Sequence, residues 1–446
     1  MKKFLVAAII FISFTTQAQK KGESIHDWSK CSNVYEINVR QFSPAGTFAE
    51  VEKQIPRLKK MGVEILWLMP IHPIGLKGRK KTENDLGSYY SVQNYRGINP
   101  EFGTEKDFQS LVKTAHKEKC KIIIDWVANH SALDHPWVSS HPDFYVHDSS
   151  GNIISPFDWT DVYKLNYKNK ALRDSMTESM KYWISKFDID GFRCDVAEEV
   201  PTDFWKSCIN KLKENKDLFM LAEGNKAELH RAGFDATYNW TLMGDMKDLY
   251  EKKINLKTFE ERVTQNQKSF PSGSLRLNFT SNHDENSWNG TEFEKYGDAY
   301  KAFAVFAFSA YQSLPLIYNG QEFSNNKRLA FFTKDEIDWS GSSLVDFYET
   351  LLNLKRNNDA MAADIPCKRI KTTADASVLA YIKESDLNRV VVLINMSGET
   401  QKFTTKDESV SGKSFEIFSK TKETISTEKV FLLNPWEYKI LVYRRQ

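Results

Sequence analysis

The chain has 446 residues, of which 41% are hydrophobic, so it is long enough to bury one large core and a second, smaller one. Its 61 Lys and Arg residues nearly balance its 59 Asp and Glu residues, and Lys2 and Lys3 account for the net charge of +2. Because a near-neutral protein has little attraction for polyanions, we expect no nucleic-acid partner.

The first 18 residues have the pattern of a secretory signal peptide. Lys2 and Lys3 precede the apolar stretch 4–14, and the polar residues that follow end at Ala18, where cleavage is expected. The apolar stretch is too short to span a bilayer comfortably. We therefore expect a signal peptide at 1–18, export to the periplasm or out of the cell, and no membrane anchor after its removal.

After this leader, short apolar runs alternate with amphipathic stretches. In chain order the pattern predicts a strand at 34–39, a helix at 48–61, a strand at 63–69, a helix at 105–119, a strand ending at Asp125, a helix at 176–187, a strand ending at Asp195, a helix at 201–213, a strand ending at Glu223, a further element at 235–240, a strand ending at Phe279, a helix at 300–311 and a strand at 314–318. Continuous apolar runs are typical of strands buried on both faces, and repeated strand–helix units predict a (β/α)8 barrel.

Two segments depart from this alternation. Residues 131–175 are rich in Ser, Asp, Pro and His and are long for a strand–helix connection, which predicts an insert after the third strand. Beyond residue 361, short strands such as 378–382 and 390–394 alternate with turns. The expected organisation is a catalytic barrel at 19–360 that contains the insert, followed by an all-β sandwich domain at 361–446.

Four of the predicted strands end in polar motifs. The motifs are Asp125-Trp126-Val127-Ala128-Asn129-His130, Gly191-Phe192-Arg193-Cys194-Asp195, Ala222-Glu223 and Ser281-Asn282-His283-Asp284. A single acid after an apolar run is most often a helix cap or a turn residue. Four such endings in order are hard to explain as caps, and in a barrel they converge on the rim that carries the chemistry. The sequence therefore predicts one active site built from these motifs.

In this order, the four motifs resemble the signature regions of the α-amylase family of retaining α-glucan glycosidases and transglycosylases. The resemblance implies that Asp195 is the nucleophile, that Glu223 is the general acid/base, and that Asp284 is a third acid that grips sugar hydroxyls. It implies an α-glucan substrate, with sugar-binding roles for Tyr90, His130, Arg193 and His283. It also places Asn129 at a calcium-ligand position.

The chemistry itself requires these residue types. Retaining hydrolysis needs one ionised carboxylate that attacks the anomeric carbon and a protonated carboxyl group roughly 5 Å away that protonates the leaving oxygen. Arg193 lies two residues before Asp195, so in a strand the two side chains share a face and the guanidinium can hold the nucleophile ionised. Aromatic rings stack on the apolar faces of sugars, which is the role expected of Tyr90. Four tryptophans are further candidates for outer sugar contacts: Trp137, Trp159, Trp240 and Trp288.

Calcium is the one cofactor that the resemblance raises. Asn129 would be joined by hard oxygen ligands from the insert, with Asp158 or Asp161 as candidates, whereas the histidine that the family has a turn after the nucleophile is missing here. No organic cofactor is expected.

We therefore expect an exported hydrolase that cleaves α-1,4-glucosidic bonds of starch-like α-glucans and maltodextrins. Typical α-amylases have Lys-His a turn after the nucleophile, but here residues 196–199 read Val-Ala-Glu-Glu. Since that tail looks more like the neopullulanase and cyclomaltodextrinase branch, the alternative is a cyclodextrin or pullulan hydrolase, or an α-glucan transglycosylase. A catalytically inactive carbohydrate-binding homologue is a remote alternative, because all three acids are present.

Overall fold

Eight parallel strands close into a barrel, which confirms the predicted fold class. The computed structural model describes residues 27–80, 84–214 and 216–444, so the predicted signal peptide at 1–18 lies outside the described residues. The barrel strands are β1 (Val34–Ile37), β2 (Ile65–Leu68), β3 (Lys121–Val127), β6 (Gly191–Asp195), β7 (Phe219–Ala222), β8 (Ala236–Tyr238), β9 (Leu275–Asn278) and β10 (Ser313–Tyr318).

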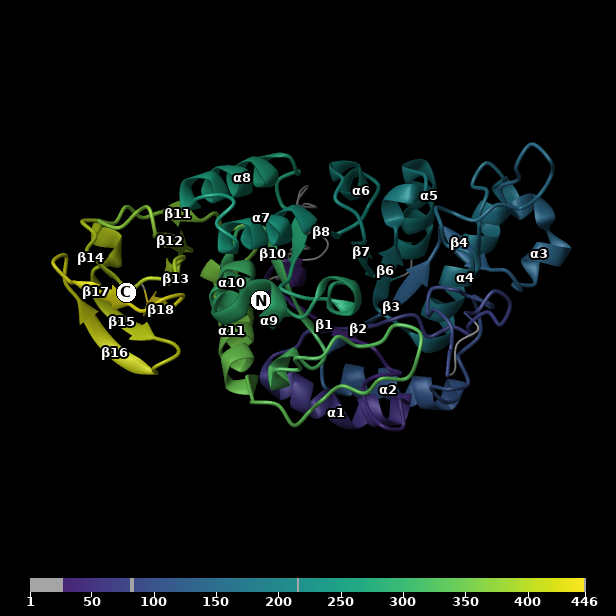
Figure 1. Cartoon of the computed structure of the whole chain (residues 1–446), viewed down its shortest axis with the longest axis horizontal. Helices are drawn as coiled ribbons and strands as arrows, with labels where there is room; N and C mark the ends of the chain where they lie inside the picture. The colour runs from purple at the N-terminus through teal and green to yellow at the C-terminus, as the bar shows by residue number, and fades with distance from the viewer. Residues whose placement is uncertain (1–26, 81–83, 215, 445–446) are drawn as a thin grey trace, which may run out of the picture.

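Helices connect the strands and cover the outside of the barrel (Figure 1). They are α1 (Phe48–Met61), α2 (Glu105–Lys117), α4 (Lys170–Phe187), α5 (Thr202–Lys213), α6 (Ala227–Arg231), α7 (Trp240–Tyr250), α8 (Leu256–Lys268), α9 (Glu292–Tyr296), α10 (Tyr300–Ser309) and α11 (Val345–Asn357). Short 3-10 helices cover Asp27–Cys31, Pro142–Phe144, Ala197–Glu199, Gly297–Ala299, Gln321–Phe323, Asp359–Met361 and Glu408–Val410, and a π-helix covers Glu285–Asn289.

The two-residue period of a strand decides which side chains fill the barrel. In β2, Ile65 and Trp67 belong to the inner cluster of buried residues, whereas Leu66 and Leu68 pack in the outer cluster that contains the helices. Gly191, at the start of β6, lies so close to β7 that an added Cβ would come within 1.8 Å of the Phe219 carbonyl oxygen. Only glycine allows this approach of the two strands.

The insert lies between β3 and α4 and contains β4 (His130–Ala132), α3 (Trp137–Ser140) and β5 (Val162–Lys164), with β4 and β5 paired antiparallel. It ends earlier than residue 175, because α4 begins at Lys170 and not near Met176. The Asn169 side chain caps this helix by accepting hydrogen bonds from the amides of Ala171, at 2.8 Å, and Leu172, at 3.2 Å.

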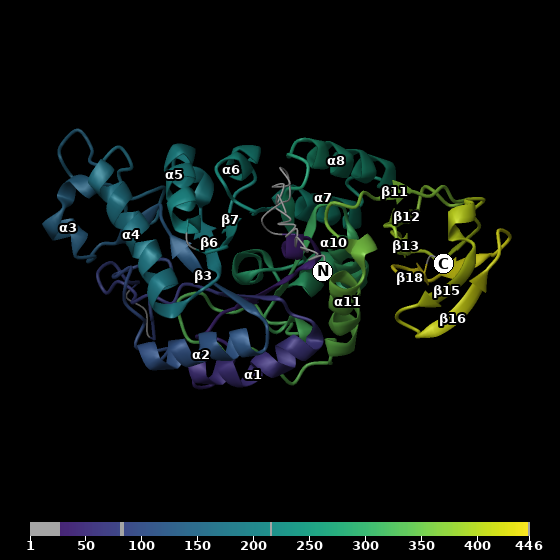
Figure 2. The same ribbon diagram turned by 180° about the vertical axis from the view of Figure 1, so that it is seen from behind.

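The C-terminal part of the chain folds into two antiparallel sheets. One sheet has the order β11 (Lys368–Arg369), β12 (Val378–Glu384), β13 (Asn388–Asn395), β18 (Tyr438–Arg444), β15 (Gly412–Glu416) and β16 (Thr421–Ile425), and the other pairs β14 (Gln401–Phe403) with β17 (Phe431–Leu433). Both sheets contribute to one buried cluster, as expected for a sandwich. Figures 1 and 2 show these sheets and the insert at opposite ends of the barrel.

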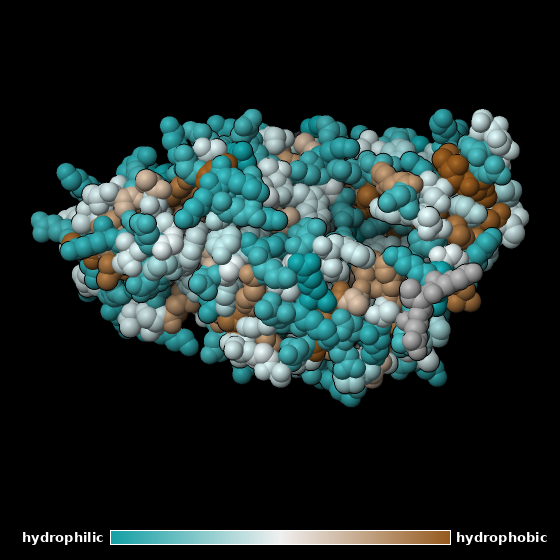
Figure 3. Space-filling view, viewed as in Figure 1, coloured by the Kyte–Doolittle hydropathy of each residue, from teal (hydrophilic) through white to brown (hydrophobic). Residues whose placement is uncertain are grey.

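In the part of the chain that the structure describes, no helix combines the length and the apolar character needed to cross a membrane. The face drawn in Figure 3 is largely hydrophilic, and its hydrophobic residues form small, separate patches.

Candidate active site

The predicted acids meet at one rim of the barrel. Asp195 is the last residue of β6, Glu223 follows β7, and Asp284 lies beyond β9. All three line a cavity of about 360 Å³, whose wall consists of Ser88, Tyr90, His130, Trp159, Asp161, Val162, Asp195, Val196, Glu223, Asp284, Trp288, Phe331 and Phe332. Parallel strands bring their carboxyl ends to the same side of a barrel, so residues distant in sequence share this cavity, which we call the catalytic pocket.

Arg193 is the electrostatic centre of this rim and is fully buried. Its Nη1 lies 2.9 Å from Oδ1 of Asp125 and 3.0 Å from Oδ1 of Asp195, and its Nη2 forms an ion pair with Oε2 of Glu223 at 3.0 Å. Its Nε donates to the Tyr238 hydroxyl at 3.1 Å. One guanidinium therefore holds two catalytic candidates, which confirms that Arg193 and Asp195 point to the same side of β6.

Asp125 supports the site from behind. The sequence predicted that strand β3 ends at Asp125. That bound was wrong, because β3 continues to Val127 and Asp125 lies inside the strand. Its carboxylate accepts hydrogen bonds from Trp67 Nε1 at 3.3 Å and from the Tyr90 hydroxyl at 3.2 Å, in addition to those from Arg193. Burial raises the pKa of Asp125 to about 6, although the Arg193 charge opposes this shift.

Burial also raises the pKa of Asp195 well above its ordinary value. The charges of Glu223 and Asp125 act in the same direction, whereas the Arg193 charge lowers the pKa. A nucleophile must be ionised in order to attack, so the ionised form of Asp195 depends on Arg193.

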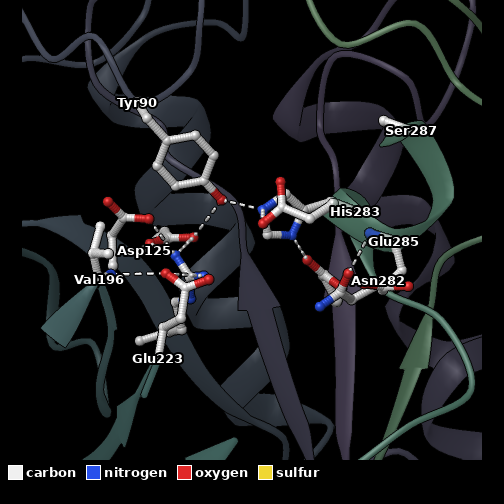
Figure 4. A network of polar contacts seen from close by, with 12 residues as sticks. Tyr90, Asp125, Val196, Glu223, Asn282, His283, Glu285 and Ser287 are labelled. Carbon is white, nitrogen blue, oxygen red and sulfur yellow. Dashed lines mark hydrogen bonds and ion pairs between the residues drawn. The ribbon is translucent and has the colours of Figure 1, made fainter. Parts of the chain in front are cut away.

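Glu223 is held in position by the turn that follows Asp195. Its Oε2 accepts a hydrogen bond of 2.7 Å from the backbone N–H of Val196, and its carbonyl oxygen accepts one of 2.9 Å from the N–H of Ala197 (Figure 4). Val196 has a φ of 39°, a left-handed conformation that is strained for a β-branched residue. Such strain is typical of functional sites, and here it aims a main-chain donor at the predicted acid/base.

Tyr90 lies across the catalytic pocket from Glu223. Its hydroxyl is 2.7 Å from Nε2 of His283 and 3.2 Å from Oδ2 of Asp125, so the ring is fixed between the two (Figure 4). The ring is nearly parallel to those of His283, at an interplanar angle of 23°, and Phe331, at 15°. These contacts hold the Tyr90 ring in the wall of the catalytic pocket.

The two predicted histidines, His130 and His283, differ in charge state. Burial lowers the pKa of His130 to about 3, so this ring is neutral. For His283, burial alone would lower the pKa, but the carboxylates of Asp284 and Glu36 raise it to about 9. Nδ1 of His283 lies 2.5 Å from Oε1 of Glu36, and Nε2 lies 3.4 Å from Oδ2 of Asp284. His283 is therefore a cation at neutral pH.

Sequence reasoning assigned no role to Glu36, Phe331 or Phe332. The signal for Glu36 was a single carboxylate in an apolar strand, which requires a partner when buried. Phe331 and Phe332 line the catalytic pocket from an irregular segment after β10. Their one signal in the sequence was that two aromatic residues stand next to each other in a polar segment.

The structure also separates the four tryptophan candidates. Trp159 and Trp288 line the catalytic pocket and are 37% and 53% exposed. Trp240 instead packs against Tyr238 and Phe279, with 5.1 Å between ring centroids in both cases. Trp137 lines a different cavity, formed by the insert and α4.

The calcium-ligand position at Asn129 is buried, and its Nδ2 is 3.3 Å from Nδ1 of its neighbour His130. Asp161 lines the catalytic pocket and Asp158 is exposed. Among the described residues, no three His, Cys, Asp or Glu side chains are grouped so that they could hold a metal ion. That search does not test a site made of Asn129 and one acid, so calcium at Asn129 stays a prediction of the resemblance, and we assign no catalytic step to it.

Known proteins resemble this chain both in sequence and in structure. A family model described as the alpha-amylase catalytic domain matches residues 15–164 and 147–364. The chain is 25% identical over 397 residues to alpha-amylase MalA of Haloarcula japonica, which covers 83% of this chain and 56% of that protein. It is 28% identical over 392 residues to an alpha-1,4-glucan:maltose-1-phosphate maltosyltransferase of Picrophilus torridus, with coverages of 79% and 59%.

Among solved structures, a maltogenic alpha-amylase of Thermotoga neapolitana superimposes with a TM-score of 0.85 and 28% identity, over 94% of this chain and 99% of that one. Of the two curated relatives, the alpha-amylase MalA and the maltosyltransferase, the chain spans little more than half the length.

Proposed function

Because the chain belongs to the alpha-amylase family, we propose that it hydrolyses α-1,4-glucosidic bonds of starch-like α-glucans and maltodextrins with retention of configuration. The observation that carries this proposal is the pair of carboxylates, Asp195 and Glu223, that contact the two terminal nitrogens of the Arg193 guanidinium at 3.0 Å each. Both acids line one pocket and share one cation, which supports the proposal because the retaining mechanism needs two carboxyl groups close together.

The reaction proceeds in two steps. Asp195 attacks the anomeric carbon while Glu223 gives its proton to the departing glycosidic oxygen, so that the C–O bond breaks and a glycosyl ester forms on Asp195. Glu223, now ionised, then removes a proton from water. The water oxygen bonds to the anomeric carbon and Asp195 is released.

Four further residues hold the sugar. Tyr90 stacks under the ring that is cleaved, and His130 and His283 hydrogen-bond its hydroxyls. Asp284, whose side chain is 36% exposed at the pocket surface, grips hydroxyls and favours the distorted ring of the transition state. A protein that only bound glucans would not need both catalytic carboxylates beside Arg193.

The second candidate is transfer of the glycosyl group to another sugar, or hydrolysis of cyclodextrin or pullulan. It is favoured by the similarity to a maltosyltransferase and by the Val-Ala-Glu-Glu tail at 196–199. Product analysis on starch, pullulan, cyclodextrin and maltose separates these activities. Internal cleavage of starch gives a spread of oligosaccharides at early times, whereas transfer gives products longer than the donor.

The direct test is release of reducing sugar from soluble starch by the wild type and by Asp195→Asn. We expect release by the wild type and its loss in the variant, because an amide cannot form the glycosyl ester. If neither protein acted on starch or maltodextrins, the proposed substrate would be wrong.

Export is part of the proposal and rests on the signal-peptide pattern at 1–18. The measurement is the N-terminal sequence of the protein recovered from the periplasm or the medium. A mature N-terminus directly after Ala18 is expected, and an uncleaved protein found only in the cytoplasm would contradict export.

A further inference from the structure

A second cavity, of about 510 Å³, lies between the insert and helix α4 and shares no residue with the catalytic pocket. Figures 1 and 2 show α3 and α4 next to each other at the end of the molecule opposite the C-terminal sheets. The residues that matter for its chemistry are Asn94, Arg96, His135, Trp137, Asp174 and Glu178, and we call this cavity the α3–α4 cavity.

His135 presents an unused hydrogen-bond donor to the α3–α4 cavity. Its side chain is only 5% exposed, and burial lowers its pKa to about 4, so the ring is neutral. Its Nδ1 accepts the backbone N–H of Trp137 at 3.1 Å, which places the ring proton on Nε2. No residue in the described part of the chain accepts a hydrogen bond from Nε2. The Nε2 atom itself is not sealed from solvent, so it can donate a hydrogen bond to a ligand that enters the cavity.

Trp137 forms a rigid apolar wall beside this donor. Its ring packs against those of His135, with 4.6 Å between centroids, Tyr95, at 5.3 Å, and Phe144, at 5.4 Å. These contacts fix the orientation of the indole before any ligand arrives, which lowers the entropic cost of binding.

The rim of the α3–α4 cavity is polar and carries both signs of charge. Asp174 and Glu178 are one turn apart on α4, so their carboxylates project from the same face of the helix. Asp174 is paired with Lys211 at 3.5 Å, and Arg96 supplies a further positive charge. Because the charges offset one another, the rim suits a neutral ligand with many hydroxyl groups better than an ion.

We infer that the α3–α4 cavity is a second α-glucan-binding site, in which Trp137 stacks on a sugar ring and His135, Asp174 and Glu178 hydrogen-bond its hydroxyls. The class of ligand rests on the proposed function. A flat sugar ring combines an apolar face with equatorial hydroxyls, which matches an indole wall next to donors and acceptors. A polymer held here raises the effective concentration of its other segments at the catalytic pocket.

The test is electrophoretic retardation of the full-length protein in native gels that contain amylopectin. Asp195→Asn serves as the parent, so that the polymer is not degraded, and Trp137→Ala and Glu178→Ala are added to it. We expect the dissociation constant for amylopectin to rise about tenfold with Trp137→Ala and about threefold with Glu178→Ala. Phe415→Ala is the matched control, because Phe415 is 39% exposed on β15, outside both cavities, and should bind as the parent does.

In the background with Asp195 intact, Trp137→Ala and Glu178→Ala should hydrolyse a short maltooligosaccharide at the wild-type rate, because neither residue lines the catalytic pocket. Melting curves show whether Trp137→Ala is folded. If Trp137→Ala does not fold, Glu178→Ala tests the same site, because Glu178 lies at the exposed rim. Retardation unchanged in both variants, together with normal hydrolysis by the wild type, overturns the second site and leaves the proposed function intact. Failure of the wild type to hydrolyse any α-glucan overturns the proposed function instead.

Discussion

His283 and Glu36 are 247 residues apart in the chain, yet Nδ1 of the histidine lies 2.5 Å from Oε1 of the glutamate, and both side chains are buried. Glu36 lies in β1 and His283 follows β9, which are separated in the barrel by β10 alone. This pair keeps a positive charge under the predicted sugar site, next to the Tyr90 hydroxyl, and it leads to a prediction about pH.

The stability of the protein should fall as the pH rises from 7 to 9.5, and Glu36→Gln should weaken this dependence. The folded-state pKa of His283, about 9, exceeds the ordinary value of 6.5, so its contribution is complete below pH 6.5 and is lost as the pH rises through 9. The full contribution is on the order of 3 kcal/mol. Denaturant unfolding of both proteins at several pH values measures it, and equal pH dependence in the two would contradict the role of Glu36.

Arg193 should be essential for both stability and catalysis. Arg193→Met leaves the buried Asp125 and Asp195 and the partly buried Glu223 without their shared cation, which should cost about 3–5 kcal/mol of unfolding free energy. Arg193→Lys retains the charge but not the planar fork, so it should be intermediate in stability, with kcat lowered by about 10²-fold or more.

Arg231→Met is the control for these variants, since Arg231 is 62% exposed and, among the residues that the structure describes, forms an ion pair only with the exposed Glu228. It should change stability by less than about 0.5 kcal/mol. Denaturant unfolding and steady-state kinetics provide the readouts. Wild-type kcat in Arg193→Lys would show that the guanidinium geometry is not needed.

Glu223 and Asp195 can be told apart by the leaving group of the substrate. A proton donor matters most when the leaving oxygen is strongly basic, so Glu223→Gln should lower kcat by about 10²–10⁴-fold on maltooligosaccharides and by much less on an aryl α-maltoside with an acidic phenol. Asp195→Asn should lose both activities. If both substrates were affected equally by Glu223→Gln, its assignment as the acid would be wrong.

Trp288 should bind sugar and not take part in bond cleavage. It is exposed, lines the catalytic pocket and lies beside Phe331, with 5.3 Å between ring centroids. Trp288→Ala should raise KM for long maltooligosaccharides about tenfold and leave kcat within about threefold, because stacking is equal in the ground state and the transition state. Trp288→Phe retains an aromatic ring and should recover most of the affinity. An unchanged KM in the alanine variant would remove Trp288 from the substrate site.

Calcium binding at Asn129 stays a prediction of the family resemblance, and a chelator tests it. If an ion is bound there, EDTA should lower Tm, and added calcium should restore it while magnesium should not, since the two ions differ in size and preferred geometry. The same Tm with and without EDTA would remove calcium from the description of this protein.

The sequence alone was sufficient to predict the barrel and the residues at its rim. Apolar runs followed by acids are local patterns, and a two-residue strand period places Arg193 and Asp195 on one face whatever surrounds them. Element bounds were less certain, as α4 shows, because a single cap at Asn169 added six residues to the predicted helix.

Only the tertiary structure decided which distant residues meet. Closure of the barrel brings Glu36 to His283, and an irregular segment brings Phe331 to the catalytic pocket. The same packing placed Trp288 in that pocket and Trp137 in the α3–α4 cavity, although both looked alike as candidates in the sequence. Such contacts depend on how loops of no fixed period pack against the barrel, and no local pattern in the chain specifies that packing.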